Sequence, residues 1–227
     1  MSMPFIAAES EERRGIDISV WQGTIDFDRV KSDGIEAVYI RAGEGSNYKD
    51  TYFERNYERA RAENLLYGFY HYVTARTVRE AEEQADFFIS LIRTKPYDMR
   101  AVMDFENLSG LTADDAVAIA RAYLERLEDG TGHKPAVYSD AYDARTVWRS
   151  RLTEYPLWVA DYGVSEPSSI GGWENWAGFQ YSDRGTVSGI RGHVDLDRFR
   201  EEIFLTDEER AETKRIRQEQ SRANDGC

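Results

Sequence analysis

Two carboxylic acids, Asp104 and Glu106, stand two residues apart at the end of the apolar segment 101–107 (AVMDFEN). If this segment is a strand, both acids point to one face and Phe105 points to the other. Crowded carboxyls repel each other, and a partly desolvated carboxyl keeps its proton to a higher pH. Cleavage of a glycosidic bond needs such a pair, because one neutral acid protonates the leaving oxygen while an ionised acid assists. The alternative is that a loop has already begun at Phe105 and that Glu106 only caps it.

Further acids occupy similar positions in two other apolar segments. Asp17 lies near the end of the first segment, and Asp195 and Asp197 share one face of the last. The first and last strands of a closed barrel are neighbours, and barrel enzymes build their active sites at the C-terminal ends of their strands. The sequence therefore predicts that several carboxyls converge on one mouth.

Short apolar segments recur along the chain with helical or loop-like stretches between them. The eight expected strands are 15–19, 37–43, 66–73, 101–107, 135–139, 157–163, 177–182 and 193–199. Strands that alternate with helices favour parallel pairing through crossovers. Eight of them within roughly 200 residues predict an α/β fold, a single irregular (β/α)8-type barrel with eight strands and fewer helices in its second half. A doubly wound open sheet is the alternative.

Two of the connecting segments have the spacing of amphipathic helices. In 77–92, the expected buried face consists of Val78, Ala81, Ala85, Phe88 and Ile92. The second helix should begin at an N-cap, Thr112, with Asp115 three residues later, and should end at Gly130. Its expected buried residues are Ala116, Ala120, Tyr123 and Leu127.

The chain divides into three parts by composition. Residues 1–14 form an N-terminal extension, 15–205 the catalytic barrel, and 206–227 a charged C-terminal tail or linker. The last part has almost no apolar residues and no stripe with which to bury a face. We expect a solvated helix or a frayed tail there; the alternative is a linker to a further module.

Charge and composition exclude several classes of partner. The formal net charge is −13, from 29 basic and 42 acidic residues, which disfavours nucleic acid and anionic membrane surfaces. No segment approaches the ~18 apolar residues of a membrane span, and no basic region precedes the short apolar patch at the N-terminus, so no signal peptide is expected. Cys227 is the single cysteine, and the three histidines are far apart. We therefore predict no cofactor and no metal.

Aromatic and amide side chains lie in or just beyond the expected strands. Flat aromatic faces suit the stacking of sugar rings, although each of them could equally belong to the core. The aromatic candidates are Trp21, Tyr70, Tyr72, Tyr138, Trp158, Tyr162, Trp176 and Tyr181. From these and the amide, the predicted substrate-binding residues are Tyr70, Tyr72, Tyr138, Trp158, Tyr162 and Gln180.

Eight motifs occur in an order that resembles the lysozymes of glycoside hydrolase family 25, the muramidases of phage endolysins and bacterial autolysins. The motifs are GIDISVWQG (15–23), RAGEG (41–45), YGFYHYV (67–73), MDFE (103–106), PAVYS (135–139), LWVADYG (157–163), FQYSDRGTVSGI (179–190) and VDLD (194–197). The likeness spans about Gly15 to Phe199. Asp197 departs from it, because the family usually has Asn there.

The resemblance implies an irregular barrel that cleaves the β-1,4 bond between N-acetylmuramic acid and N-acetylglucosamine in peptidoglycan. Carried over by position, Glu106 is similar to the general acid, and Asp104 to the partner that assists through the substrate's acetamido group or stabilises positive charge. Asp17 and Asp195 match the two further acids of the catalytic set.

Two other functions stay open at this point: a family 18-like chitinase, and a catalytically inactive barrel that only binds glycans. For the muramidase, the expected partner is the glycan strand of bacterial peptidoglycan, bound by a monomer with or without a separate cell-wall-binding module. We expect a phage endolysin that waits in the host cytoplasm for holin-type release and then acts on the cell wall.

Overall fold

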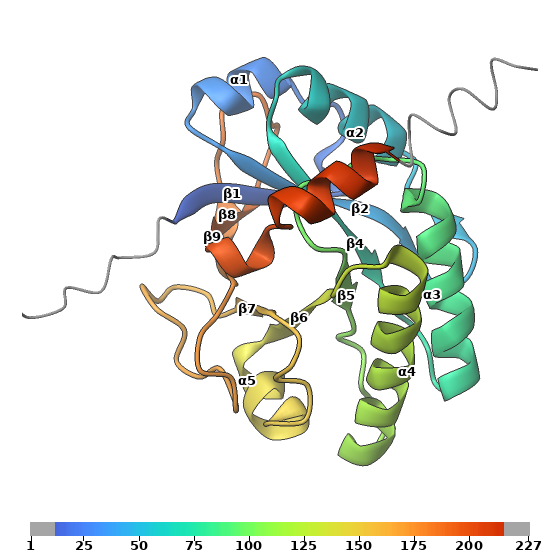
Figure 1. Ribbon diagram of the computed structural model, residues 1–227. Helices are drawn as coiled ribbons and strands as arrows, with labels where there is room; N and C mark the ends of the chain where they lie inside the picture. Colours follow the sequence, from blue (N-terminus) through green and yellow to red (C-terminus); the bar gives the residue numbers. More distant parts are fainter. Residues whose placement is uncertain (1–11, 216–227) are drawn as a thin grey trace, which may run out of the picture.

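Eight strands close into a barrel in the computed structural model, which describes residues 12–215 (Figure 1). Around the barrel they are β1 (Arg13–Ile18), β2 (Ala37–Glu44), β4 (Leu66–Tyr72), β5 (Val102–Asp104), β6 (Ala136–Asp140), β7 (Leu157–Ala160), β8 (Gly178–Gly185) and β9 (Val194–Phe199). The pairing of β1 with both β2 and β9 closes the ring. The short β3 (Tyr48–Lys49) pairs only with the end of β2. The predicted eight-stranded barrel is therefore confirmed, and so is the contact between its first and last strands.

The last strand runs in the opposite direction to the prediction. Strand β9 is antiparallel to both of its neighbours, β1 and β8, whereas the other pairings around the barrel are parallel. The reason is the connection 186–193, which is shorter than the dozen or so residues that a parallel crossover needs. As a consequence, the beginning of β9, rather than its end, lies at the mouth of the barrel.

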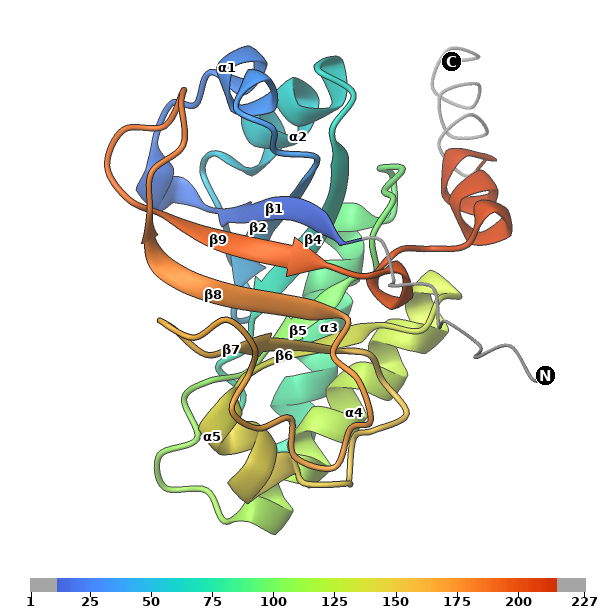
Figure 2. The same ribbon diagram turned by 90° about the vertical axis from the view of Figure 1, so that its left-hand side faces the viewer.

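Alternation along the strands divides the core into two layers. Side chains that point outward, such as Val38, Phe69 and Phe179, are fully buried under the helices and loops. Side chains that point inward fill the lower barrel, where the rings of Tyr39 and Trp158 stack with centroids 4.7 Å apart. The Tyr39 hydroxyl donates to the backbone oxygen of Arg100 at 2.9 Å. Figure 2 shows the strands that surround this aromatic filling.

The four longer helices of the barrel all precede β6. They are α1 (Phe27–Ser32), α2 (Phe53–Ala62), α3 (Val78–Ile92) and α4 (Ala113–Thr131), and the last two lie side by side along one flank of the barrel (Figure 1). After β6 there is one turn of α5 (Ala141–Asp143), continued by the π-helical turn η2 (Ala144–Trp148). Only turns and bends occupy the connection 161–177 between β7 and β8. The predicted loss of helices in the second half is confirmed.

Most of the predicted helical details are confirmed. The expected buried residues are buried in both helices except Val78, which is 44% exposed because it is the first residue after the N-cap, Thr77. The amide of Asp115 donates to Thr112 Oγ1 at 3.1 Å, as predicted for the N-cap. The predicted stop at Gly130 is wrong.

Helix α4 continues past that glycine and ends at Gly132, whose φ of 73° is the left-handed conformation favoured at a helix C-terminus. Gly130 instead serves the packing of α4 on α3. A Cβ at this position would lie 2.4 Å from Ile89 Cδ1. Close approach rather than the backbone angle therefore favours glycine here, because a larger residue would need Ile89 to move.

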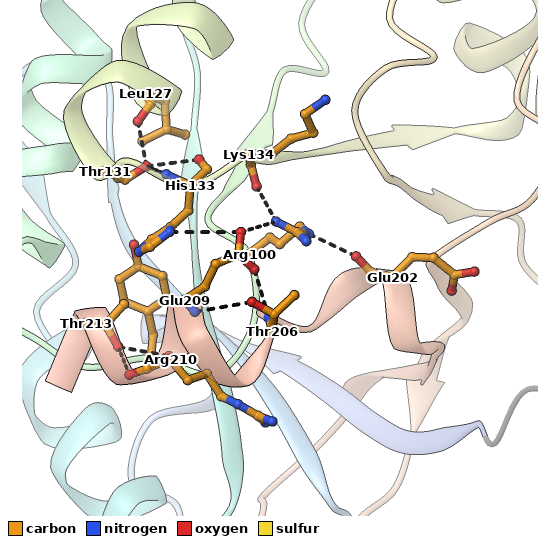
Figure 3. Close-up of polar contacts among 11 residues, drawn as sticks. Arg100, Leu127, Thr131, His133, Lys134, Glu202, Thr206, Glu209, Arg210 and Thr213 are labelled. Carbon is orange, nitrogen blue, oxygen red and sulfur yellow. Dashed lines mark hydrogen bonds and ion pairs between the residues drawn. The ribbon is translucent and has the colours of Figure 1, made fainter.

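The segment after the barrel packs against the end opposite the mouth. Residues 207–215 are helical, and Thr213 in this helix is 4% exposed. Arg100 donates to Glu209 Oε1 at 3.4 Å, and His133 Nδ1 lies 4.0 Å from the same oxygen (Figure 3). A helix was one of the two expectations for this part, but it is not solvated on all sides, because polar contacts dock it. Residues 216–227 of the predicted tail and 1–11 of the predicted extension lie outside the described residues.

Replacement of Thr112 by Ala should lower the free energy of unfolding by about 1 kcal/mol, because the amide that it caps at the start of α4 loses its acceptor. Urea denaturation followed by far-UV circular dichroism measures the change. Thr112→Ser keeps the hydroxyl and should stay near the wild-type value; an equal loss in both variants would contradict the capping role.

Candidate active site

The acids predicted to do chemistry meet in one cavity of about 250 Å³ at the C-terminal end of the barrel strands. All ten predicted residues line it: Asp17, Asp104, Glu106, Asp195, Tyr70, Tyr72, Tyr138, Trp158, Tyr162 and Gln180. Four further residues line it: Ser19, Gln22, Arg41 and the aromatic candidate Trp21, whereas the candidates Trp176 and Tyr181 do not. Three of these four belong to the motif GIDISVWQG, which could have indicated them.

Three of the four acids lie on strands, and the fourth lies in the loop after β5. Asp104 is the last residue of β5, and Asp17 of β1 is paired in register with Asp195 of β9. Glu106 lies two residues beyond β5, so the strand predicted over 101–107 is too long and the backbone there is already a loop. The side chain of Glu106 nevertheless lines the cavity. The loop alternative is thus right about the backbone, while a catalytic role for the Glu106 side chain stays a prediction.

Asp17 is held by a hydrogen-bonded relay of neutral groups. Gln180 Nε2 donates to Asp17 Oδ2 at 2.6 Å. The other amide atom, Gln180 Oε1, accepts from the hydroxyls of Tyr138 at 2.9 Å and Tyr162 at 2.7 Å. Two hydroxyl donors therefore fix the amide so that its NH₂ faces the carboxylate. Gln180 positions Asp17 without adding charge.

Asp104 and Asp197, unlike Asp17, are buried with one carboxyl oxygen that has no hydrogen-bond partner among residues 12–215. Asp104 is 6% exposed, and the oxygen concerned is its Oδ1. Asp197 is 1% exposed and lies one level below the mouth, where it accepts from Trp158 Nε1 at 2.9 Å. An unpartnered buried oxygen is costly for an ionised carboxyl, and Asp197 Oδ2 has no partner in the same part of the chain either, so both sites favour the protonated form.

One wall of the cavity is braced by a buried ion pair. Arg41 Nε lies 3.0 Å from Asp50 Oδ2, and the same oxygen accepts from the backbone amide of Val20 at 2.9 Å. This amide begins the 3₁₀ turn η1 (Val20–Gln22), which Ser19 and Gln22 close with a capping box. The turn carries Trp21, which is 82% exposed at the rim of the cavity.

Crowding and burial raise the pKa of every acid in the cavity. Burial, with the added charge of Asp195, raises the pKa of Asp17 well above its ordinary value. Burial and the charge of Glu106 do the same to the pKa of Asp104. Partial desolvation raises the pKa of Glu106, which opens to the cavity, and burial raises that of Asp195 to about 6. Arg41 is the one cation among the lining residues. The cluster therefore retains protons well above the pH at which isolated carboxyls ionise.

These acids do not form a metal site of the usual kind. Within residues 12–215, no group of three or more His, Cys, Asp or Glu side chains is arranged to hold a metal ion. In the same part of the chain, no helix has the length and apolar character of a membrane span.

A mostly parallel barrel with paired carboxyls and aromatic walls at its C-terminal mouth has the architecture of a barrel glycosidase. The family described as Glycosyl hydrolases family 25 matches residues 16–190. The chain belongs to this family. Membership decides against the family 18-like alternative.

Individual relatives agree with the family match. The chain is 36% identical over 192 residues to an autolytic lysozyme of Clostridium acetobutylicum, an alignment that covers 85% of this chain and 57% of that protein. It is 33% identical over 204 residues to lysozyme M1 of Streptomyces globisporus, with 85% and 69% covered. The crystal structure of a lysozyme from Streptomyces coelicolor superposes with a TM-score of 0.75 at 32% identity, covering 84% of this chain and 93% of that one. The chain thus spans little more than half of the Clostridium protein.

The stability of the protein should fall as the pH rises through the raised pKa of Asp195. In the folded state this carboxyl holds its proton up to about pH 6, against an ordinary pKa of 3.8. Its contribution to stability is therefore present below about pH 4 and is lost between about pH 4 and 6. Urea melts at intervals from pH 4 to 7 should show a smaller fall for Asp195→Asn than for wild type. Glu174→Gln, an exposed acid in the β7–β8 connection, serves as control; a wild-type slope in Asp195→Asn would contradict the assignment.

Proposed function

We propose that the chain is a peptidoglycan hydrolase, an N-acetylmuramidase that cleaves the β-1,4 bond between N-acetylmuramic acid and N-acetylglucosamine. The observation that carries the proposal is the pair formed by Asp104, buried with an unpartnered oxygen, and Glu106, open to the same cavity with a raised pKa. Lysozymes among the relatives support the choice of substrate.

In this proposal Glu106 is the proton donor. Its raised pKa keeps the carboxyl neutral where isolated glutamates are ionised, and its place in a loop at the rim lets it reach an oxygen outside the barrel. When the glycosidic bond breaks, the proton moves from Glu106 to the leaving oxygen while positive charge develops on the ring that remains.

Asp104 acts on the remaining ring. Its carboxyl lines the cavity, in which an acetamido N–H of the substrate is a suitable donor. An accepted hydrogen bond there would orient the acetamido group toward the sugar carbon from which the leaving oxygen departs, or the carboxylate would stabilise the positive charge directly. Asp195, whose pKa is raised only to about 6, adds to the negative potential once it is ionised, and Asp17 lies beside it in register.

We also propose the setting of a phage endolysin that accumulates in the host cytoplasm and reaches the wall after holin-type release. The autolytic lysozyme and a solved endolysin structure, 26% identical with a TM-score of 0.70, support cell-wall lysis as the common theme. Expression in a bacterial host with and without a holin tests the proposal. Lysis should require the holin, and spontaneous lysis by the chain alone would contradict it.

Glu106→Gln should abolish lysis of purified cell walls, with a loss on the order of a thousandfold, because an amide cannot donate a proton to the leaving oxygen. The fold should persist, since the side chain opens to the cavity. Turbidity clearance measures the rate, and Glu174→Gln is the matched control. Survival of lysis in Glu106→Gln would show that another acid is the donor, and an inactive wild type would favour a glycan-binding barrel.

The sugar left at the new reducing end identifies the bond that is cut. Digested peptidoglycan reduced with borohydride and analysed by mass spectrometry should contain reduced muramic acid. Reduced glucosamine in its place, or cleavage of chitin with intact walls, would overturn the muramidase assignment.

A further inference from the structure

A second cavity, of about 510 Å³, adjoins the first on the side of β6 and β7. The two cavities share Glu106, Tyr138 and Tyr162 among their lining residues. They therefore form one continuous groove, and the proposed proton donor stands where the two parts join. None of the residues predicted from the sequence accounts for the second part except the three that are shared.

The distribution of acids shows which part holds which sugar. Asp17, Asp104 and Asp195 line only the first cavity. Positive charge develops on the ring that loses the leaving oxygen, so that ring belongs beside these three carboxyls. The proton must be delivered to the oxygen on the other side of the broken bond. The second cavity therefore lies on the leaving-group side of Glu106.

The second cavity offers aromatic faces. Tyr142 is 63% exposed and Tyr162 is 47% exposed, although both carry large rings. Tyr142 lies in the single turn of α5, where the guanidinium of Arg145 sits over one face of its ring, 5.9 Å from the centroid. Burial does not account for this ring, because most of it faces solvent beside the groove.

Carboxylates complete the walls. Asp140 Oδ1 accepts from the amide of Asp143 at 2.6 Å, and Asp161 Oδ2 accepts from the amide of Ser168 at 2.7 Å. Each carboxylate is thus anchored by one oxygen and has a second oxygen available. Such oxygens accept hydrogen bonds from sugar hydroxyl groups, and their negative charge would repel an anionic ligand. The combination fits a neutral part of a glycan better than an acidic peptide.

We propose that the second cavity binds the sugars on the leaving side of the scissile bond, and that Tyr142 is the residue on which one of these rings stacks. The inference rests on the proposed hydrolase function and deepens it. A stacking residue on the leaving side contributes binding energy only when the substrate continues beyond the broken bond. The protein should therefore prefer polymeric strands to substrates that end at the cleavage point.

Two substrates separate this role from a general effect on the fold. Glycan strands of several disaccharide repeats fill both cavities, whereas the β-fluoride of the N-acetylglucosaminyl–N-acetylmuramic acid disaccharide has no sugar on the leaving side. Tyr142→Ala should lower kcat/KM about tenfold on the strands and leave it within about twofold of wild type on the fluoride. Tyr142→Phe keeps the ring and should behave like wild type on both.

Val78→Ala is the control, because Val78 is also an exposed apolar side chain, at 44%, and lines neither cavity. It should leave both rates unchanged. An equal fall of Tyr142→Ala on both substrates, or no fall on the strands, would overturn the assignment of Tyr142. Inactivity of the unmodified chain on both substrates would instead overturn the proposed hydrolase itself.

A binding measurement tests the same contact without turnover. In the Glu106→Gln background, calorimetric titration with the glycan strands should give a Kd about tenfold weaker when Tyr142 is also replaced by Ala. Equal dissociation constants in the two proteins would contradict stacking on Tyr142.

Discussion

Repulsion among carboxyls confined to a desolvated barrel mouth is the constraint on which the rest of the structure depends. Four acids line one cavity and a fifth, Asp197, lies just below it. Neutral donors, the amide of Gln180 and the indole of Trp158, stabilise two of the acids. The single lining cation, Arg41, is already paired with Asp50. Because little positive charge is supplied, part of the negative charge must be neutralised by protons, and a proton is what glycosidic cleavage needs.

The reversed strand β9 makes this crowding possible. A parallel last strand would offer the mouth only its C-terminal residues, whereas the antiparallel one brings in its N-terminal residues. Asp195 then stands level with Asp17, and Asp197 falls one step deeper on the same face. The short connection that forces the reversal therefore also determines that Asp195 lines the cavity and that Asp197 accepts the hydrogen bond of Trp158 below it.

The sequence could predict the composition of the cavity better than its backbone. Side-chain alternation and strand ends brought the ten predicted residues to one place, because inward-facing positions at a strand end converge in any closed barrel. The alternation of inward and outward side chains does not show in which direction a strand runs. Only the short connection 186–193 therefore indicated that β9 is antiparallel. Gly130 and Gly132 look alike in sequence, and only the structure distinguishes the contact of Gly130 with Ile89 from the left-handed backbone of Gly132. The leaving-side cavity depends on loops after β6 and β7, whose course no periodic pattern describes.

The stacked rings of Tyr39 and Trp158 have a consequence for how a long polymer can be handled. They fill the barrel beneath the carboxyls, so the mouth is a dish with a closed bottom and not the entrance to a tunnel. Under the proposed function, a glycan strand would be laid across the dish from the side and lifted away after the cut. A closed bottom of this kind would let the proposed hydrolase engage a strand away from its ends, because no chain end has to be threaded through the barrel.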